Sequence, residues 1–213
     1  METRDKQILY YVTVDGSSAP FRVWREAILD KRLRAAIDAR IARMRAGNFS
    51  DSRPIGSGAS ENRIDFGPGF RIYYGLDGDK VILLWAAINQ VRLPIFRSPS
   101  DIGRITGKEQ KMKRAENYKA DLLEDLRNDA EYAAEYLTAA KADSTEAFLV
   151  ALRDVAEARK GMKRVAKEAK VNRENLYRAL SKRGNPRIDT VDAVLNTLGL
   201  QLVFRPRKRT RRS

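Results

Sequence analysis

Arginine and asparagine side chains gather in one C-terminal stretch, GMKRVAKEAKVNRENLYRALSKRGNP (161–186). Arginine can form two hydrogen bonds to a guanine edge in the major groove of DNA, and asparagine can do the same with adenine. This composition predicts a surface that reads DNA bases. The residues expected to contact DNA are Asn172, Arg173, Asn175, Arg178, Lys182 and Arg183.

The same stretch has the layout of a helix-turn-helix unit, which we expect at 162–182. Residues 170–172 suit a tight turn, and Asn172 suits the N-cap of the second helix, where the free amides could also hold a phosphate. A plain helical hairpin with a solvated charged face is the alternative. Val165 and Ala166 lie in the first predicted helix, and Leu176, Tyr177 and Leu180 of the second are expected to face the core.

A second group of arginines lies in the N-terminal region, among the predicted strands ENRIDF, FRIYYGL and KVILLW. Arg63 and Arg71 fall on adjacent strands, and Arg53 lies on the preceding loop. Guanidinium groups can stabilise charge that develops on a phosphate, and Tyr73 or Tyr74 could stack on a base or transfer a proton. These side chains are candidate contacts for a phosphate and a base, with ordinary solvent-facing sheet residues as the alternative.

The composition narrows the possible chemistry. The 213 residues include no Cys and no His, which excludes disulfides, the usual zinc sites and catalysis by thiol or imidazole groups. We therefore expect no cofactor and no metal. No apolar run approaches the roughly 18 residues of a membrane span, and the N-terminus lacks a signal-peptide layout, so a cytoplasmic protein without a membrane partner is expected.

The net charge of +14 is unevenly distributed. Residues 161–213 carry 15 basic and 4 acidic side chains, and the chain ends in a basic tail (206–213). Residues 112–160 carry 8 basic and 11 acidic side chains, against 19 and 13 in residues 1–111. The basic end predicts a nucleic-acid partner, and the acidic middle is expected to pack on the basic N-terminal region.

The order of sequence patterns predicts two regions. A strand pattern at 7–14 is followed by helical spacing over 21–46, a loop at 46–60 and three short strands. This β-α-α-β-β-β order indicates an α+β domain at 1–85, an antiparallel sheet with helices on one side. Residues 86–111 fit no element and are predicted to form a linker.

From residue 112 to 205 the pattern is all-α. Asp129 is expected to cap one helix, and an Asp/Ser pair is expected to start the helix that stops at Gly161. LQLVF (200–204) is a candidate closing strand.

The helical region resembles a known family through NYKADLLEDL, AAEYLTAA, AFLVALRDVAEARKGM and NRENLYRALSKRGNP. These segments are similar to HigA-like antitoxins, the bacterial addiction module antidote proteins. The resemblance covers about 112–204. It implies an all-α helix-turn-helix domain that binds its own operator DNA, represses transcription and neutralises a partner toxin, and we expect a homodimer.

The N-terminal region resembles HigB-like toxins of the RelE/ParE superfamily. The resemblance covers about 7–85 and is carried by PFRVW, RIARMRAGNFSDSRPIGSGASENRIDFGPGFRIYY and KVILLW. It implies a RelE/ParE-like fold and a contact with the antitoxin region in cis. Many superfamily members are ribosome-dependent endoribonucleases that cut mRNA, whereas others poison gyrase, so the target stays open.

The end of the toxin-like region departs from the family. In the HigB-like family, the last strand continues into a pattern like LLxGGDKSxQxxDIxxAKxxW. In this chain, VILLW is followed by AAINQVRLPIFRSPSDIGRI. The genetic code allows a set of codons for Trp85–Gly103 that would encode GGDKSxQxxDIxKAKxYW if the gene were read one base earlier. This predicts that 86–111 is a frameshifted toxin tail and that Met112 is the former start of a separate antitoxin. The toxin-like region is expected to be inactive as an enzyme, because no residue here replaces the lysine of the GGDK ending.

Three functions stay open at this point. The leading hypothesis is a toxin–antitoxin fusion whose impaired toxin region is neutralised in cis by a DNA-binding antitoxin region. The second is a transcriptional regulator whose toxin-like region serves only for folding or dimerisation. The third is an active ribonuclease silenced in cis.

Overall fold

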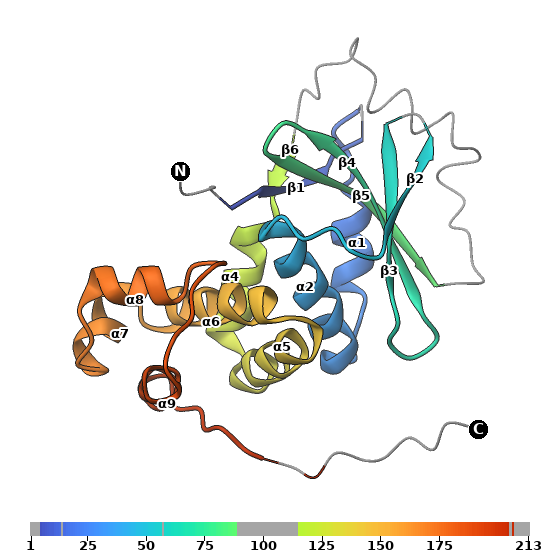
Figure 1. Ribbon diagram of the computed structural model, residues 1–213. Helices are drawn as coiled ribbons and strands as arrows, with labels where there is room; N and C mark the ends of the chain where they lie inside the picture. Colours follow the sequence, from blue (N-terminus) through green and yellow to red (C-terminus); the bar gives the residue numbers. More distant parts are fainter. Residues whose placement is uncertain (1–4, 14, 57, 89–114, 205, 207–213) are drawn as a thin grey trace.

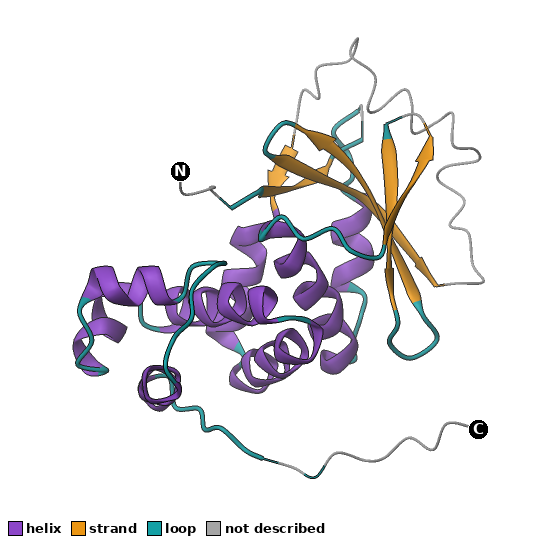
Figure 2. Ribbon diagram, in the orientation of Figure 1, coloured by secondary structure: helices purple, strands orange, loops and turns teal. Residues whose placement is uncertain are grey.

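The computed structural model describes residues 5–13, 15–56, 58–88, 115–204 and 206. An N-terminal region with a mixed sheet and two helices is followed by a helical C-terminal region (Figure 1, Figure 2). The described elements, in chain order, are β1 (Gln7–Tyr11), α1 (Pro20–Glu26), α2 (Lys31–Arg45), β2 (Ser52–Gly56), β3 (Ala59–Ile64), β4 (Phe70–Asp77), β5 (Lys80–Ile88), β6 (Ala115–Asn117), α4 (Tyr118–Asn128), α5 (Ala130–Asp143), α6 (Thr145–Arg159), α7 (Met162–Glu168), α8 (Arg173–Ala179) and α9 (Ile188–Thr197).

The sheet has the strand order β2-β3-β4-β5-β1-β6. All neighbouring strands are antiparallel except β1 and β5, which run parallel. The prediction of a purely antiparallel sheet was therefore wrong. After β1 the chain crosses the sheet through α1 and α2, and it returns through successive antiparallel strands that leave β5 beside β1 in the same direction.

Two strands lie where none was expected. β2 occupies part of the predicted loop 46–60, and Pro54 is compatible with it because β2 is an edge strand. β6 lies in the region predicted to be all-helical and pairs antiparallel with β1. β5 also continues to Ile88, into the predicted linker, whose residues 89–111 lie outside the described part of the chain.

The helical pattern predicted over 21–46 forms two helices. Pro20 is the first residue of α1, a position where its fixed backbone angle is favourable. The pattern breaks at 27–30, and the Asp30 side chain accepts hydrogen bonds from the amides of Arg32 and Leu33 at 2.8 and 3.2 Å. This N-cap starts α2 in a new direction.

Side-chain caps also start three of the C-terminal helices whose starts were predicted. Asp129 caps α5, Ser144 caps α6 and Asn172 caps α8, which confirms the predicted starts. Gly161, with a φ of 77°, follows the end of α6. The predicted closing strand at 200–204 was wrong, because this segment is extended but belongs to no strand.

One hydrophobic core spans both regions. It includes Tyr10 and Ile41 from the N-terminal region and Tyr136, Val155 and Leu176 from the C-terminal region. The helices α1 and α2 lie between the sheet and the C-terminal helices, while α7 and α8 form the end farthest from the sheet (Figure 1). Within the described ranges, no helix has both the length and the apolar character needed to cross a membrane.

Candidate functional site

The interface between the two regions contains a buried ion pair, Arg25–Asp38. Arg25 of α1 donates from Nε and Nη2 to the two carboxylate oxygens of Asp38 in α2, at 2.9 and 2.6 Å. Their side chains are 2% and 0% exposed. A buried carboxylate must have its charge and its lone pairs satisfied, and one guanidinium meets only part of this need.

The C-terminal helices complete the coordination of Asp38. Tyr118 of α4 donates its hydroxyl to Asp38 Oδ1 at 2.8 Å, and Tyr132 of α5 donates to Oδ2. Asp125 of α4 lies 2.8 Å from Arg25 Nη2. The polar centre of the N-terminal helices is therefore satisfied by side chains that come from the other region.

A second buried pair crosses the interface directly. Arg45, at the end of α2, lies 2.6 Å from Asp154 Oδ2 in α6, and the two side chains are 6% and 0% exposed. Tyr136 of α5 donates to the same oxygen at 3.1 Å. Removing either charge would leave the other buried without compensation, which is a costly arrangement.

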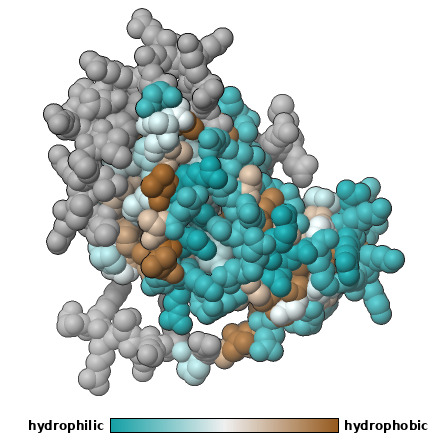
Figure 3. All heavy atoms as spheres, turned by 180° about the vertical axis from the view of Figure 1, so that it is seen from behind, coloured by the Kyte–Doolittle hydropathy of each residue, from teal (hydrophilic) through white to brown (hydrophobic). Residues whose placement is uncertain are grey.

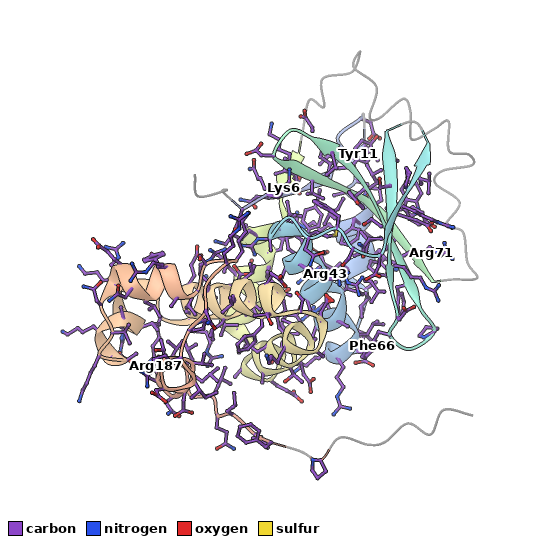
Figure 4. The ribbon with its side chains drawn as sticks, viewed as in Figure 1. Lys6, Tyr11, Arg43, Phe66, Arg71 and Arg187 are labelled. Carbon is purple, nitrogen blue, oxygen red and sulfur yellow. The ribbon has the colours of Figure 1, made fainter. Side chains whose placement is uncertain are left out.

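A third contact lies between α2 and the end of α5. Asp143 is 3.1 Å from Arg40 Nε and 3.1 Å from Arg43 Nη1. Arg43 also lies 2.7 Å from Asp51. Figure 4 shows Arg43 in the helical layer, on the opposite side of the sheet from Arg71.

More exposed pairs surround these buried groups and follow the predicted charge pattern. Lys31 lies 2.8 Å from Asp129, and Arg22 lies 2.9 Å from Asp121. Arg22 also binds Glu116 of β6 at 2.7 Å, beside the strand that the C-terminal region adds to the sheet. The expectation that the acidic middle of the chain packs on the basic N-terminal region is thus confirmed.

The buried groups have perturbed acid–base properties. Burial raises the pKa of Tyr118, Tyr132 and Tyr136, and a neighbouring Asp carboxylate raises each further. Burial opposes the charge on Arg25, but the adjacent Asp38 carboxylate outweighs this and raises the pKa of Arg25. The interface therefore contains neutral tyrosines that donate to carboxylates and arginines that remain charged.

The sequence predicted that the two regions pack together, but it did not identify the buried residues of their interface. None of Arg25, Asp38, Arg45 or Asp154 was among the candidate residues. A usable signal was present, because Asp38 lies between Ile37 and Ala39 in α2, on a stretch whose neighbours are apolar and buried. A lone carboxylate among core residues indicates a paired charge.

The predicted phosphate and base contacts, apart from Tyr74, share one face of the sheet, the face opposite the helices. Tyr74 was also offered as a base contact, but it is buried in the core on the other face. Cα register places Arg63 opposite Arg71, Arg53 opposite Glu61, and Glu61 opposite Tyr73. Arg71 points away from the helical layer in Figure 4. The structure therefore brings the four predicted side chains, Arg53, Arg63, Arg71 and Tyr73, onto one surface, here called the arginine face.

A carboxylate that the sequence reasoning missed organises this face. Glu61 Oε1 lies 2.5 Å from Arg53 Nε and 2.6 Å from Arg71 Nη1, and the Glu61 side chain is 8% exposed. Arg63 pairs with Asp65 at 2.8 Å. The ring of Tyr73 stacks on Trp85 with a centroid separation of 4.5 Å. The arginines are thus held in place by acidic partners, next to an aromatic stack.

The predicted DNA contacts lie at the end of the molecule farthest from the sheet. Arg173, Asn175 and Arg178 are exposed on α8, and the exposed Asn172 precedes them as its N-cap. Lys182 and Arg183 follow in the turn after α8, where Lys182 is half-buried and Arg183 is exposed. Seen from behind, this end is covered mainly by hydrophilic side chains (Figure 3).

The predicted side chains on α8 are already engaged with one another. Asn172 accepts from the amides of Glu174 and Asn175 at 2.9 and 3.3 Å, so its side-chain oxygen is used as a cap. Arg178 donates to Asn175 at 2.7 Å. Tyr177 is 40% exposed, so its predicted place in the core was wrong, while Leu176 and Leu180 are fully buried. Tyr177 is the fifth residue of the seven-residue α8 and points outward, with the Arg173 guanidinium over its ring.

The described residues hold no group of three or more acidic side chains that could bind a metal ion.

Comparison with known proteins gives a match for the C-terminal region. Residues 116–206 match the family described as "Probable addiction module antidote protein". Two proteins of Haemophilus influenzae, each named "Uncharacterized protein", match shorter stretches. One is 48% identical over 59 residues, covering 28% of this chain and 60% of that protein, and the other is 42% identical over 65 residues, covering 30% and 66%.

The chain spans less than two thirds of the length of either relative. No solved structure matches it. The predicted resemblance of the C-terminal region to addiction module antidote proteins is thus confirmed at the level of the family description.

Proposed function

We propose that the chain is a toxin–antitoxin fusion in which the antidote region holds a HigB-like N-terminal region in cis. The observation that carries this proposal is the buried interface between α4–α6, within the matched antidote range, and the helices α1 and α2. Its centre is two buried carboxylates, Asp38 and Asp154, each bonded by groups from both regions. Such an interface is typical of a permanent complex rather than a transient one.

The way the regions pack indicates how neutralisation would act. The C-terminal helices contact α1 and α2 and add β6 to the edge of the sheet, while the arginine face lies on the other side. The antidote region therefore does not block the arginines directly. It would act by steric exclusion, because a toxin with α4–α6 attached is too large to enter its site on the ribosome.

The arginine face supports an RNA-directed activity for the toxin-like region. RNA cleavage of this class needs attack by a 2′-hydroxyl on the adjacent phosphate, with stabilisation of the charge on the phosphoryl oxygens. Arg53 and Arg71 converge on one Glu61 oxygen, so a phosphate that replaced this carboxylate would receive two guanidinium groups. Tyr73 and Trp85 offer an aromatic surface for a neighbouring base.

We further propose that the activity of this face is impaired. The family's GGDK ending is absent after Trp85, and the residues that replace it from 89 onward lie outside the described part of the chain. Glu61 also pairs with both Arg53 and Arg71, so a phosphate must displace this carboxylate before it can contact the two guanidinium groups.

The C-terminal end supports operator binding. α7 and α8 are short helices joined at 169–172, with the turn carried by Lys170 at a φ of 55°. α8 exposes Arg173, Asn175 and Arg178 at the end opposite the sheet. We propose that α7 and α8 form a helix-turn-helix unit whose second helix enters the major groove. In this arrangement DNA and the toxin-like region do not compete.

Growth measurements test the fusion. A one-base correction that restores the GGDKS ending should yield a separate toxin that arrests growth, and residues 112–213 supplied in trans should relieve the arrest. Arg71→Ala in the restored toxin should lower the rate of RNA cleavage about 100-fold or more and so reduce toxicity. The reason is that the change removes one donor that stabilises the developing charge. A restored toxin that leaves growth unchanged while accumulating as folded protein would overturn the proposal.

A second candidate function is a DNA-binding regulator whose toxin-like region is only structural. The pairing of both Arg53 and Arg71 with Glu61 favours it, because these contacts already hold the two guanidinium groups in place. The intact chain with Asp154→Arg tests for remaining toxin activity, because this change puts a second arginine against Arg45 and opens the interface. Slower growth would exclude a purely structural role of the toxin-like region, whereas unchanged growth with retained DNA binding is expected both for the regulator and for a fully inactivated toxin.

A further inference from the structure

The chain enters β2 through a residue with an unusual backbone conformation. Asp51 has a φ of 67°, in the left-handed region that residues other than glycine seldom adopt. A conformation of this kind persists where neighbouring groups hold it in place. Arg53 of the arginine face follows Asp51 by two residues, so the contacts that hold Asp51 also influence where Arg53 lies.

Two arginines of α2 hold residues 50–52, here called the β2 entrance. Arg43 donates from Nη2 to Ser50 O at 2.9 Å and to Asp51 Oδ2 at 2.7 Å. Arg40 donates from Nη1 to the same Asp51 oxygen at 3.0 Å. The hydrogen bond from Arg43 lowers the pKa of the Asp51 carboxyl, which therefore stays charged at neutral pH.

The neighbouring strand β3 holds the β2 entrance from its other side. The Arg63 amide donates to Asp51 O at 3.1 Å, and Arg40 Nη1 donates to Arg63 O at 2.6 Å. Asn62, which is fully buried, donates from Nδ2 to Ser50 O at 3.1 Å. The β2 entrance, α2 and β3 therefore form one hydrogen-bonded unit, in which Arg40 of α2 contacts both of the other parts.

One carboxylate of the antidote region joins this unit from the end of α5. Asp143 Oδ2 lies 3.1 Å from Arg40 Nε, and Asp143 Oδ1 lies 3.1 Å from Arg43 Nη1. The three side chains are between 8% and 12% exposed, so solvent screens these contacts only in part. A guanidinium carries its donors around a rigid plane, so a carboxylate that fixes one edge also orients the other.

We infer that Asp143 is a positioning residue of the arginine face. By fixing Arg40 and Arg43 it keeps the β2 entrance in place, and this keeps Arg53 within 2.5 Å of Glu61. The inference rests on the proposed role of the arginine face in binding RNA. It adds a second mode of neutralisation to steric exclusion, because an Arg53 that is held on Glu61 is less available to a phosphate.

The position of β2 matters for Arg53 because this side chain is 69% exposed. A largely exposed arginine has many rotamers and is not confined by packing. Its pairing with Glu61 depends on the strand register, which places Arg53 opposite Glu61. Because β2 is at the edge of the sheet and β3 is its one neighbour there, contacts at the β2 entrance help to fix this register.

Hydrogen exchange of the full chain tests the inference without RNA or growth measurements. The Arg63 amide reports on the β2 entrance through its bond to Asp51 O, and the Arg53 Nε proton reports on its bond to Glu61. Asp143→Asn should speed both exchanges about tenfold, the effect expected when one charge-assisted hydrogen bond is lost. Amides within α5 and α6 should exchange as before, whereas a general weakening of the interface would speed them too.

The matched control is Glu135→Gln, which removes the same charge from the same helix. Glu135 pairs with Arg32 of α2 at 3.4 Å, and the Arg32 side chain is 75% exposed. This control should leave both exchange rates unchanged. Unchanged exchange of the Arg63 amide in Asp143→Asn, or equal effects of Asp143→Asn and Glu135→Gln, would overturn the inference.

A double-mutant cycle shows whether the effect passes through the two arginines. Asp51→Asn removes the charge at the other end of the link, and asparagine tolerates the left-handed conformation. It should also speed exchange of the Arg63 amide, and adding Asp143→Asn to it should have little further effect. Full additivity of the two changes would contradict the link. Because RNA is absent from the experiment, an arginine face that fails to bind RNA would leave this result unaffected.

Discussion

Arg45 and Asp154 join the two regions of the chain at the centre of their interface. The guanidinium Nη1 lies 2.6 Å from Oδ2 of the carboxylate, and both side chains are nearly inaccessible to solvent. The other carboxylate oxygen, Oδ1, has no hydrogen-bond partner among the described residues. Arg45 is thus the charged partner of Asp154, and the interface depends on the pair remaining intact.

Asp154→Asn should destabilise the intact chain strongly. The change keeps the shape of the side chain but leaves the Arg45 charge buried without a counter-charge, which typically costs about 3–5 kcal/mol. Urea unfolding measures the loss. The matched control is Asp189→Asn, because Asp189 pairs with Arg187 while the two side chains are 72% and 85% exposed. This control should cost less than about 1 kcal/mol. Equal effects of the two changes would contradict the assigned role of Asp154.

The stability of the chain should fall as the pH rises above about 10. Burial raises the pKa of Tyr118, Tyr132 and Tyr136 above the value of 10.0 that applies to the unfolded chain. A group whose pKa is raised by folding contributes its full stabilisation below the unfolded value and loses it progressively above that value. Unfolding free energies at neutral and alkaline pH measure the loss.

Single substitutions identify the tyrosines behind this alkaline loss. Tyr132→Phe should weaken the pH dependence, because this phenylalanine cannot ionise in the unfolded chain. Tyr177→Phe should leave it nearly unchanged, since Tyr177 is 40% exposed and outside the interface. An identical pH profile for Tyr132→Phe and the wild type would contradict the assignment.

Local features of the fold could be predicted from the sequence, whereas relationships between distant residues could not. Asp129 and Asn172 cap their helices as predicted because capping is decided within a few residues. The β1–β5 pairing joins residues far apart in the chain, and no local pattern specifies its parallel direction. β2 was hidden by Pro54 and Gly56, which resemble loop residues but are tolerated on an edge strand.

The candidate sites show the same division. Arg63 and Arg71 were predicted on adjacent strands, whereas Arg53 was predicted on a loop and lies in β2. Glu61, which holds two of them, was not recognised as their partner because pairing depends on register between strands. Asp38 and Asp154 acquire partners only when α4–α6 pack on α2. Among 28 acidic residues, the sequence does not indicate which ones become buried.

Sequence-specific DNA binding should depend on α8. Arg178→Ala and Asn175→Ala should each weaken operator binding by roughly 1–3 kcal/mol and relax the preference for one base pair. Titration of operator DNA and of single-base variants measures both effects. The matched control is Arg53→Ala, which removes an arginine that is 69% exposed on the sheet. A loss of affinity for the control as large as that for Arg178→Ala would contradict readout by α8.

The basic tail should contribute charge rather than sequence preference. Arg205 and the basic tail (206–213) together carry six basic side chains, and their removal should reduce the slope of log affinity against log salt by about 5 if all six meet phosphates. The relative affinities for operator variants should stay the same. A slope that is unchanged after truncation would show that the tail makes no phosphate contact.

Cleavage of the chain between its two regions tests the central claim most directly. A specific protease site inserted at 98–108 allows the intact protein to be cut after folding, and size-exclusion chromatography then follows both fragments. We expect the fragments to elute together, because they share one core and the buried contacts of Asp38 and Asp154. Asp154→Arg should make the cut fragments separate, while Asp189→Asn should not. Fragments of the wild type that separate freely after cleavage would contradict the account.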